Sequence, residues 1–355
     1  MGRCFLYRTG AGSGGMTKGE IVVTAVAGAA VTCSNGSVTK TAAATNGTCI
    51  FSGLSDGTWT IKATLDGETI TESVVMDYPR RIFLVLVDSI PAFSYTGDFE
   101  IVNDADEAIT YAKDNWKIRF LSSGTLTFTK LNGASKGIDV FLVGGGGGGG
   151  YKGNFASGGG GGYTTTKKGV FVATNTPYQI TIGEGGAPVT QGDTSAPGGA
   201  SEAFGYSANG GYPGYGSNYV SSGKGGNGGS GGGAGMMGGD DHYSGDGHGG
   251  EDGSDGGSVN HGGTTAKGGT GQGTTTREFG ESTGKLYSGG GGGGASMGYI
   301  AYPPGVGGEG GGGDGGRSSK QGTPGAPNTG GGGGGAAYGV GVSGGSGIVI
   351  IRNKR

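Results

Sequence analysis

The sequence predicts an all-β protein: a small N-terminal β-sandwich, then a second β-sandwich that carries a glycine-rich insertion. Three observations predict this architecture. Short strand-like runs before residue 90 are separated by dipeptides that favour tight hairpins. Of the 96 glycines, 80 lie between Gly144 and Gly347. Apolar, strand-like sequence flanks that segment at 138–143 and 348–352. An insertion held at both ends by one sheet favours an ordered glycine structure over a disordered tail.

Composition excludes several classes of function. The 355 residues have room for two or three domains, but only 32% are apolar, and core-building residues concentrate before residue 144. A net charge of −3 gives no electrostatic basis for binding nucleic acid or anionic membranes. The glycine-rich half has two arginines, Arg277 and Arg317, too few for a disordered RNA-binding segment. We therefore expect no nucleic-acid partner.

Membrane insertion and classical secretion are not expected either. No apolar run is long enough to span a bilayer. Residues 1–16 form a short Gly/Ser-rich junction without the apolar stretch of a signal peptide.

Residues 17–90 are expected to form the first sandwich. Six runs have strand character: 21–26, 30–33, 49–52, 58–64, 68–75 and 81–87. The dipeptides Asn35-Gly36, Asn46-Gly47, Asp56-Gly57 and Asp66-Gly67 punctuate them and accept the positive φ angles of tight turns. Apolar and polar residues alternate over 58–63, as on a strand with one buried face.

The three cysteines carry little information. Cys33 and Cys49 occupy neighbouring strand-like segments and are placed to face one another. Two small buried or half-buried thiols are the favoured interpretation, with a disulfide as the alternative. Cys4 is unassigned.

The passage 45–60 (TNGTCIFSGLSDGTWT) resembles the G-x-x-x-F-x-G-L-x-x-G-x-W-x passage of small Ig-like β-sandwich modules related to the carboxypeptidase regulatory domain. The likeness covers about seventy residues. It implies an Ig-like fold and the role of a spacer or connector, which such modules have on extracellular and virion proteins.

Residues 91–355 are expected to form the second sandwich with its insertion, 144–347. Strands are predicted at 93–97, 116–121 and 124–129 by alternation and β-branched content. The run 138–143 is apolar at nearly every position, which predicts a strand buried on both faces. Further strands are predicted at 169–174 and 177–182, and a short helix is considered for 104–115.

Two familiar glycine repeats are excluded by the spacing of the glycine runs, which lie at 144–150, 158–162, 289–294, 310–313 and 330–335. Collagen needs a strict three-residue period and more than ten prolines. A calcium-binding β-solenoid needs a nine-residue repeat that is not kept. A bundle of extended three-fold helices of the polyglycine II type, or disorder, remains. Ordering a residue costs about 1–2 kcal/mol, and a hydrogen bond to a neighbouring run returns about 0.5–1.5 kcal/mol. Because these terms nearly cancel, we expect the flanking strands to determine whether the glycine runs are ordered.

Four motifs resemble the glycine-rich tail proteins of phages and prophages of Gram-positive gut bacteria. They are 139–143 (DVFLV) before polyglycine, 274–281 (TTTREFGE), 284–288 (GKLYS) before polyglycine, and the closing 344–352 (GGSGIVIIR). The likeness covers roughly residues 91–352 and is most specific in the closing motif.

The architecture is also similar to the glycine-rich adhesins at the tips of T-even phage tail fibres. In those adhesins, slabs of polyglycine II helices present variable loops to a bacterial receptor. A more distant likeness to the extracellular glycine-rich region of anaplastic lymphoma kinase informs the fold only. The receptor loops correspond here by position and composition, not by motif.

A glycine slab has almost no side chains, so recognition must come from the residues that interrupt it. Tyrosine suits this role because it offers a broad face and one polar tip at low entropic cost. The candidate receptor-binding residues are Tyr206, Tyr212, Tyr215, Tyr219, Met236, Met237, Asp240, Asp241, His242, Tyr243, His248, Met297, Tyr299 and Tyr302. The alternative is that these side chains cap the slab or fill gaps against the sheet.

Metal binding and catalysis are not favoured. Asp240, Asp241, His242, Asp246 and His248 match no zinc or EF-hand spacing, so solvated loop charges are the preferred interpretation. No nucleophile elbow, HExxH motif or carboxylate pair in an apolar pocket is visible. The glycine run after Val143 follows a strand but precedes no helix, so it is no phosphate loop. We expect a non-enzymatic protein without a cofactor.

The expected function is a phage or prophage tail-tip adhesin that recognises a bacterial surface receptor, glycan or protein, through loops displayed on polyglycine II. The expected location is the virion tail tip, after synthesis in the host cytoplasm, with other tail components as partners. A purely structural virion or bacterial cell-surface protein is the alternative. A disordered, self-associating segment is disfavoured by the scarcity of arginine and by the closing strand.

Overall fold

The computed structural model describes residues 18–25, 28–65, 68–77, 81–86, 90–109, 115–151, 155–188, 195–217, 224–237, 256–257, 270–271, 273, 275–296, 303–317, 320–336 and 339–355. Over these residues the chain is all-β, as predicted, with two single 3-10 turns, η1 (Asn132–Ala134) and η2 (Glu278–Gly280). The described part contains no helix that is long and apolar enough to cross a membrane.

The N-terminal strands form a β-sandwich of two sheets. One sheet has the order β4-β1-β7, with β1 (Gly19–Ala25) pairing antiparallel to β4 (Thr48–Leu54) and parallel to β7 (Arg81–Leu86). The other has the order β3-β2-β5-β6, from β2 (Ala30–Ser34), β3 (Thr39–Ala43), β5 (Gly57–Leu65) and β6 (Glu68–Met76). Both sheets contribute to one core, which includes Ile21, Phe51 and Trp59. Strand β3 was not predicted, because TKTAA lacks the large β-branched residues that mark its neighbours.

Cys33 and Cys49 are free thiols buried in this core, as the sequence favoured. They lie on β2 and β4, in different sheets. Burial raises the pKa of the Cys33 thiol to about 11. A protonated, buried thiol acts as a small apolar side chain.

The second sandwich packs two five-stranded sheets. The first has the order β14-β12-β21-β10-β9: β14 (Thr164–Val170), β12 (Ile138–Val143), β21 (Ile348–Asn353), β10 (Lys117–Phe120) and β9 (Phe99–Val102). The second has the order β17-β16-β15-β11-β8: β17 (Tyr206–Ala208), β16 (Ser201–Ala203), β15 (Pro177–Thr181), β11 (Gly124–Lys130) and β8 (Ala92–Tyr95). Ile118, Leu126, Val140, Ile180 and Val349 share the core between them.

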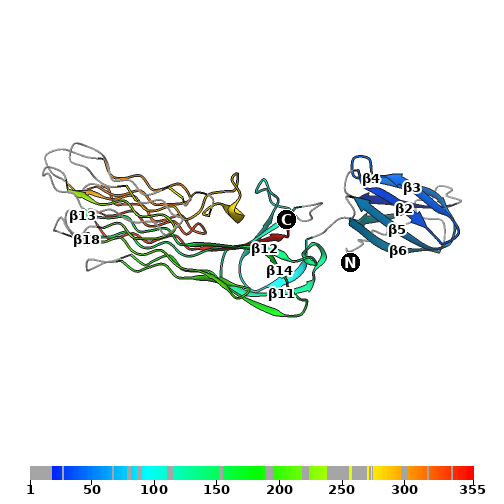
Figure 1. The fold of residues 1–355 in the computed structure, drawn as a ribbon, viewed down its shortest axis with the longest axis horizontal. Helices are drawn as coiled ribbons and strands as arrows, with labels where there is room; N and C mark the ends of the chain where they lie inside the picture. Colours follow the sequence, from blue (N-terminus) through cyan, green and yellow to red (C-terminus); the bar gives the residue numbers. More distant parts are fainter. Residues whose placement is uncertain are drawn as a thin grey trace.

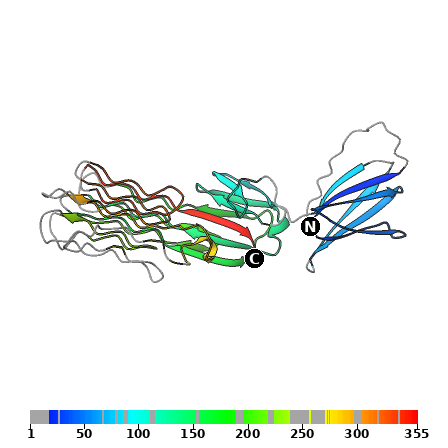
Figure 2. The same ribbon diagram turned by 90° about the horizontal axis from the view of Figure 1, so that it is seen from above.

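The two margins of the glycine-rich insertion are neighbouring strands of one sheet, as predicted. Strands β12 and β21 pair antiparallel, and Val143, the last residue before the glycines, lies opposite Ile348. The insertion therefore leaves and re-enters the sheet at a single place. In Figures 1 and 2 its runs extend side by side from that edge of the sandwich.

Two local predictions in this sandwich were wrong over the described residues. The helix considered for 104–115 does not form over 104–109, because Asp106 has a φ of 62° and the Asn103 side chain closes a loop onto the Glu107 amide. The strand predicted at 169–174 ends at Val170, since Gly169 has a φ of 65° where the pairing with β12 shifts register. Residues 110–114 lie outside the described part.

The glycine runs form a lattice held by hydrogen bonds with three-residue periodicity. In the run 144–150 every amide donates to another run, with N···O distances between 2.8 and 3.1 Å. Residues 144, 147 and 150 donate to run 157–163, residues 145 and 148 to run 196–199, and residues 146 and 149 to run 342–345. A helix with three residues per turn presents every third amide on the same side, so this pattern is that of polyglycine II.

Carbonyl groups of the same run accept from three further segments. Residues 145 and 148 accept from 211 and 214, residue 146 accepts from 186, and residues 147 and 150 accept from 333 and 336. The run is therefore surrounded on six sides. Run 157–163 repeats the arrangement and donates to 209–215, 230–233 and 330–333.

Six neighbours leave no room for a side chain in an inner run. A Cβ atom built on Gly146, Gly147 or Gly149 would stand closer than 3.0 Å to a carbonyl oxygen of another run. The uninterrupted glycine runs 144–150, 158–162, 289–294 and 330–335 are buried at every residue. Uninterrupted glycine thus marks the interior of the lattice.

Outer runs expose a residue to solvent at every third position. Residues 209, 212 and 215 are exposed while those between them are at most half-exposed, and the same holds for 224 and 227 and for 303, 306 and 309. Gly-Gly-X spacing occurs in these outer runs, for example at 225–227 and 307–309. Run 310–313 is different, because Gly310 and Gly311 have φ angles of 93° and 100° and form a turn.

We predict that Gly147→Ala destabilises the second sandwich and its lattice by about 3 kcal/mol or more, because the methyl group overlaps the Tyr212 carbonyl. Trp116 lies in the second core and Trp59 in the first, and these are the chain's two tryptophans. Urea unfolding in a Trp59→Phe background therefore reports on the second sandwich.

Gly199→Ala is the matched control, since its added Cβ would meet no atom closer than 3.1 Å. It should destabilise the protein less than Gly147→Ala does. Equal effects of the two substitutions would contradict the lattice as described.

Candidate functional site

One segment of the insertion, residues 275–288, packs on the outer face of the β12 sheet; we call it the clasp segment. Phe279 and Tyr287 cover Phe141, with ring centroids 5.9 and 5.4 Å from it. Phe141 and Val143 join this outer cluster, while Val140 and Leu142 face the sandwich core. Strand β12 is thus buried on both faces, as its continuous apolar sequence predicted.

A charged cluster ties the clasp segment to β10. Lys117 and Glu278 are both almost fully buried, and the Lys117 Nζ lies 3.1 Å from Glu278 Oε1 and 2.6 Å from Asp106 Oδ1. Arg119 pairs with Asp106 as well, and with Glu100 at 3.2 Å. Burial acts to raise the pKa of Asp106, but hydrogen bonds from Arg119 and Lys117 hold it below its ordinary value.

A second buried pair joins the two margin strands. Asp139 of β12 is fully buried, and its Oδ2 lies 3.3 Å from Nη2 of Arg352 on β21. Its other oxygen accepts from the Gly169 amide at 3.0 Å. The Arg352 guanidinium lies 4.0 Å from the centre of the Phe279 ring and reaches Glu281 at 2.6 Å. Hydrogen bonding to Arg352 lowers the pKa of Glu281.

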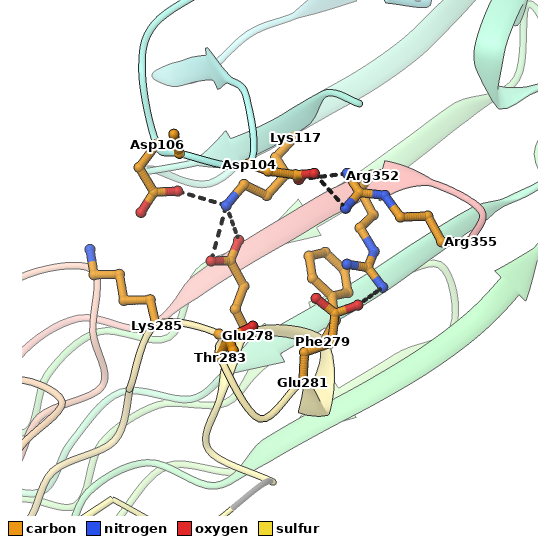
Figure 3. A pocket seen from close by; sticks show the side chains of 12 residues that line it. Asp104, Asp106, Lys117, Glu278, Phe279, Glu281, Thr283, Lys285, Arg352 and Arg355 are labelled. Atoms are coloured by element: carbon orange, nitrogen blue, oxygen red, sulfur yellow. Dashed lines mark hydrogen bonds and ion pairs between the residues drawn. The ribbon is translucent and has the colours of Figure 1, made fainter. Parts of the chain in front are cut away.

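A polar pocket of about 400 Å³, shown in Figure 3, is lined by residues that include Asp106, Lys117, Glu278, Glu281 and Arg352. Its labelled side chains come from the 104–106 loop, β10, the clasp segment and the C-terminal strand. Lys117 points to Glu278 and Asp106, Arg352 points to Glu281, and Arg355 pairs with Asp104 at 2.7 Å. Because these acidic and basic side chains pair with one another, we interpret the site as a structural contact between the insertion and the sheet. We call this contact, together with the Asp139–Arg352 pair and the Phe279 and Tyr287 rings, the clasp.

The clasp gives the sequence motifs a physical role. Asp139 opens the DVFLV motif, Glu278 and Phe279 belong to TTTREFGE, Tyr287 to GKLYS and Arg352 to the closing motif. All of them meet at this one place. Sequence reasoning recognised the motifs but did not assign the ion pairs. The sequence did contain a signal for the Asp139–Arg352 pair. Asp139 and Arg352 are charged residues in the otherwise apolar strands β12 and β21, which pair with one another in one sheet.

The described candidate residues fall in three places. Tyr206 packs against the sandwich core and has Lys167 Nζ 5.3 Å from its ring centre. Tyr212 and Tyr215 lie on an outer lattice run, 56% and 43% exposed. Met236 and Met237 form β19, which pairs parallel with β20 (Ala295–Ser296). The structure therefore brings Tyr212 and Tyr215 together and assigns Tyr206 to packing.

The other candidates lie outside the described residues and remain predictions. They are Tyr219, Asp240, Asp241, His242, Tyr243, His248, Met297, Tyr299 and Tyr302, together with Asp246 of the considered metal cluster. Within the described part, no group of three or more His, Cys, Asp or Glu side chains is arranged to hold a metal ion.

We predict that Asp139→Ala destabilises the second sandwich by about 3–5 kcal/mol, because it leaves the buried Arg352 short of a counter-charge. The double variant Asp139→Ala/Arg352→Met removes both charges and should recover part of that loss. Urea unfolding followed by Trp116 fluorescence in the Trp59→Phe background measures both. A double variant no more stable than Asp139→Ala would argue against the pair as the source of the effect.

Comparison with known proteins gives a family for the second part of the chain. No curated protein matches the sequence significantly. A family model described as a glycine-rich domain matches residues 121–354, which include β12, the lattice, the clasp segment and β21. The chain therefore belongs to the glycine-rich domain family.

Proposed function

We propose that this protein is a receptor-binding adhesin of a phage or prophage tail tip, which attaches to a bacterial surface through side chains displayed on the polyglycine II lattice. The motif resemblance over residues 91–352 supports this assignment. The lattice supports it as well, because its inner runs are uninterrupted glycine and its outer runs expose a residue at every third position.

The carrying observation is the fixed backbone beneath the displayed side chains. Tyr212 and Tyr215 each donate and accept a main-chain hydrogen bond to other runs. A side chain on an immobile backbone loses little conformational entropy when it binds, which raises affinity without further contacts. This arrangement suits a surface whose task is to hold a partner under load.

The clasp supports the same proposal. It adds a buried contact between insertion and sheet beyond the strand margins, through Phe279, Glu278 and Arg352. A force applied to the lattice is then transmitted to the sandwich. In this proposal the N-terminal sandwich is the Ig-like spacer that joins the adhesin to other tail components.

The test is attachment of fluorescently labelled protein to a panel of candidate bacterial hosts. Replacing residues 240–243 and 297–302 with Gly-Ser removes the acidic, histidine and aromatic side chains predicted to contact the receptor. We expect this variant to lose attachment about ten-fold or more while its unfolding curve stays that of the parent protein.

A control replaces Val38, an exposed residue (47%) in a hairpin of the N-terminal sandwich, with Ser and should attach normally. Failure of the folded parent protein to attach to any strain would count against the adhesin. Defective tail assembly by the 240–243/297–302 variant, when the folded parent protein attaches to no strain, would instead favour the structural role considered from the sequence. Normal attachment by this variant would exclude residues 240–243 and 297–302 as receptor contacts.

A further inference from the structure

Side chains on the outer run 209–215 form a regular row. Asn209, Tyr212 and Tyr215 are exposed, and Gly211, Pro213 and Gly214 between them are buried. The three-fold helix repeats every three residues with a rise of about 3.1 Å per residue, so the two tyrosines project from the same side about 9 Å apart.

A second row of polar side chains runs beside the first. Lys224 and Asn227 are exposed on the neighbouring run, again three residues apart. The Tyr212 amide donates to the Asn227 carbonyl at 2.8 Å, and the Tyr215 amide donates to the Lys224 carbonyl at 3.0 Å. Each exposed ring therefore has a polar side chain based on the adjoining backbone. We call Asn209, Tyr212, Tyr215, Lys224 and Asn227 the aromatic stripe.

The backbone beneath the stripe is committed to the lattice. The Tyr212 carbonyl accepts from the Gly160 amide and the Tyr215 carbonyl accepts from the Ser157 amide, both at 2.9 Å. A peptide partner that adds a strand needs free backbone donors and acceptors. The amide of each tyrosine is already donated, and its carbonyl already accepts. Strand addition is therefore disfavoured, so a partner must be recognised by the tyrosine rings and by the polar side chains of the stripe.

A third tyrosine extends the apolar surface inward. The Tyr163 amide donates to the Asn209 carbonyl at 2.8 Å, and the Tyr163 side chain is half-buried. Burial raises the pKa of the Tyr163 hydroxyl, and the neighbouring Tyr212 raises it further. The rings thus stand on a surface that is aromatic rather than aliphatic, with amide and ammonium groups at its edge.

We infer that the aromatic stripe binds a linear polysaccharide whose chain runs along the lattice axis. The apolar faces of two sugar rings stack on Tyr212 and Tyr215, and hydroxyl groups pair with Asn209, Asn227 and Lys224. Regular spacing matches a polymer with a regular repeat, and the fixed rings need no ordering on binding. The inference rests on the proposed function and names its receptor class.

Fluorescence anisotropy with labelled linear hexasaccharides of β-1,4-linked glucose, β-1,4-linked N-acetylglucosamine and a uronic acid polymer tests the inference. We expect at least one hexasaccharide to bind, and its monosaccharide, which cannot reach both rings, to bind at least ten-fold more weakly. Tyr212→Ala and Tyr215→Ala should each weaken binding about ten-fold. Because Tyr212 and Tyr215 are surface residues, 56% and 43% exposed, these variants should unfold much like the parent protein.

Phe171→Ala is the matched control, since Phe171 is an exposed aromatic residue (81%) outside the stripe. It should bind as the parent protein does. The inference is overturned if no hexasaccharide binds, if the tyrosine variants bind normally, or if Phe171→Ala weakens binding equally.

Host attachment measured in parallel separates this inference from the proposed function. Unchanged attachment of the Tyr212→Ala/Tyr215→Ala double variant would overturn the stripe as a receptor site and leave the adhesin standing. If protease treatment of the host cells abolishes attachment and added polysaccharide does not compete, the receptor is a protein. That result would also overturn the stripe as a polysaccharide-binding site. Hexasaccharide binding lost in the tyrosine variants, without attachment to any host, would support the stripe and contradict the adhesin.

Discussion

Each amide of the runs 144–150 and 157–163 donates to a carbonyl on a different run, and the rest of the insertion depends on this requirement. A polyglycine II helix has no internal hydrogen bonds, so it is ordered only among neighbours. Neighbours close enough to bond exclude a Cβ atom. The number of neighbours around a run therefore constrains its sequence: uninterrupted glycine inside, and one exposed residue in every three outside.

The lattice cannot select its own register, because glycine runs are alike. Register comes from the sheet, where Val143 and Ile348 lie opposite one another and fix both ends of the insertion. The Asp139–Arg352 pair and the rings of Phe279 and Tyr287 reinforce that junction. Separating the partners of a buried ion pair leaves an uncompensated buried charge, which is strongly destabilising. We therefore expect the Asp139–Arg352 pair to disfavour arrangements in which β12 and β21 are mispaired.

Much of this architecture could be predicted from the sequence because it follows from local pattern. The strand 138–143, its burial on both faces and the joined margins of the insertion follow from continuous apolar residues beside glycine. The clasp could not be predicted, because Glu278 and Lys117 are 161 residues apart in the sequence and only the folded insertion brings them together. Tyr206 resembled Tyr212 in its glycine-rich context, yet it lies on β17 and packs on the sandwich. Amino-acid composition does not distinguish a tyrosine on a strand from one on a lattice run. The structure does, because exposed residues recur every three positions on an outer lattice run.

Hydrogen–deuterium exchange of the glycine runs tests the central claim most directly. If main-chain bonds between runs order the insertion, peptides covering 144–150, 157–163 and 330–336 should exchange slowly and should lose protection together with strand β12 as urea is added. Exchange of these peptides at the rate of an unstructured chain, while β12 and β21 stay protected, would contradict the lattice and everything built upon it.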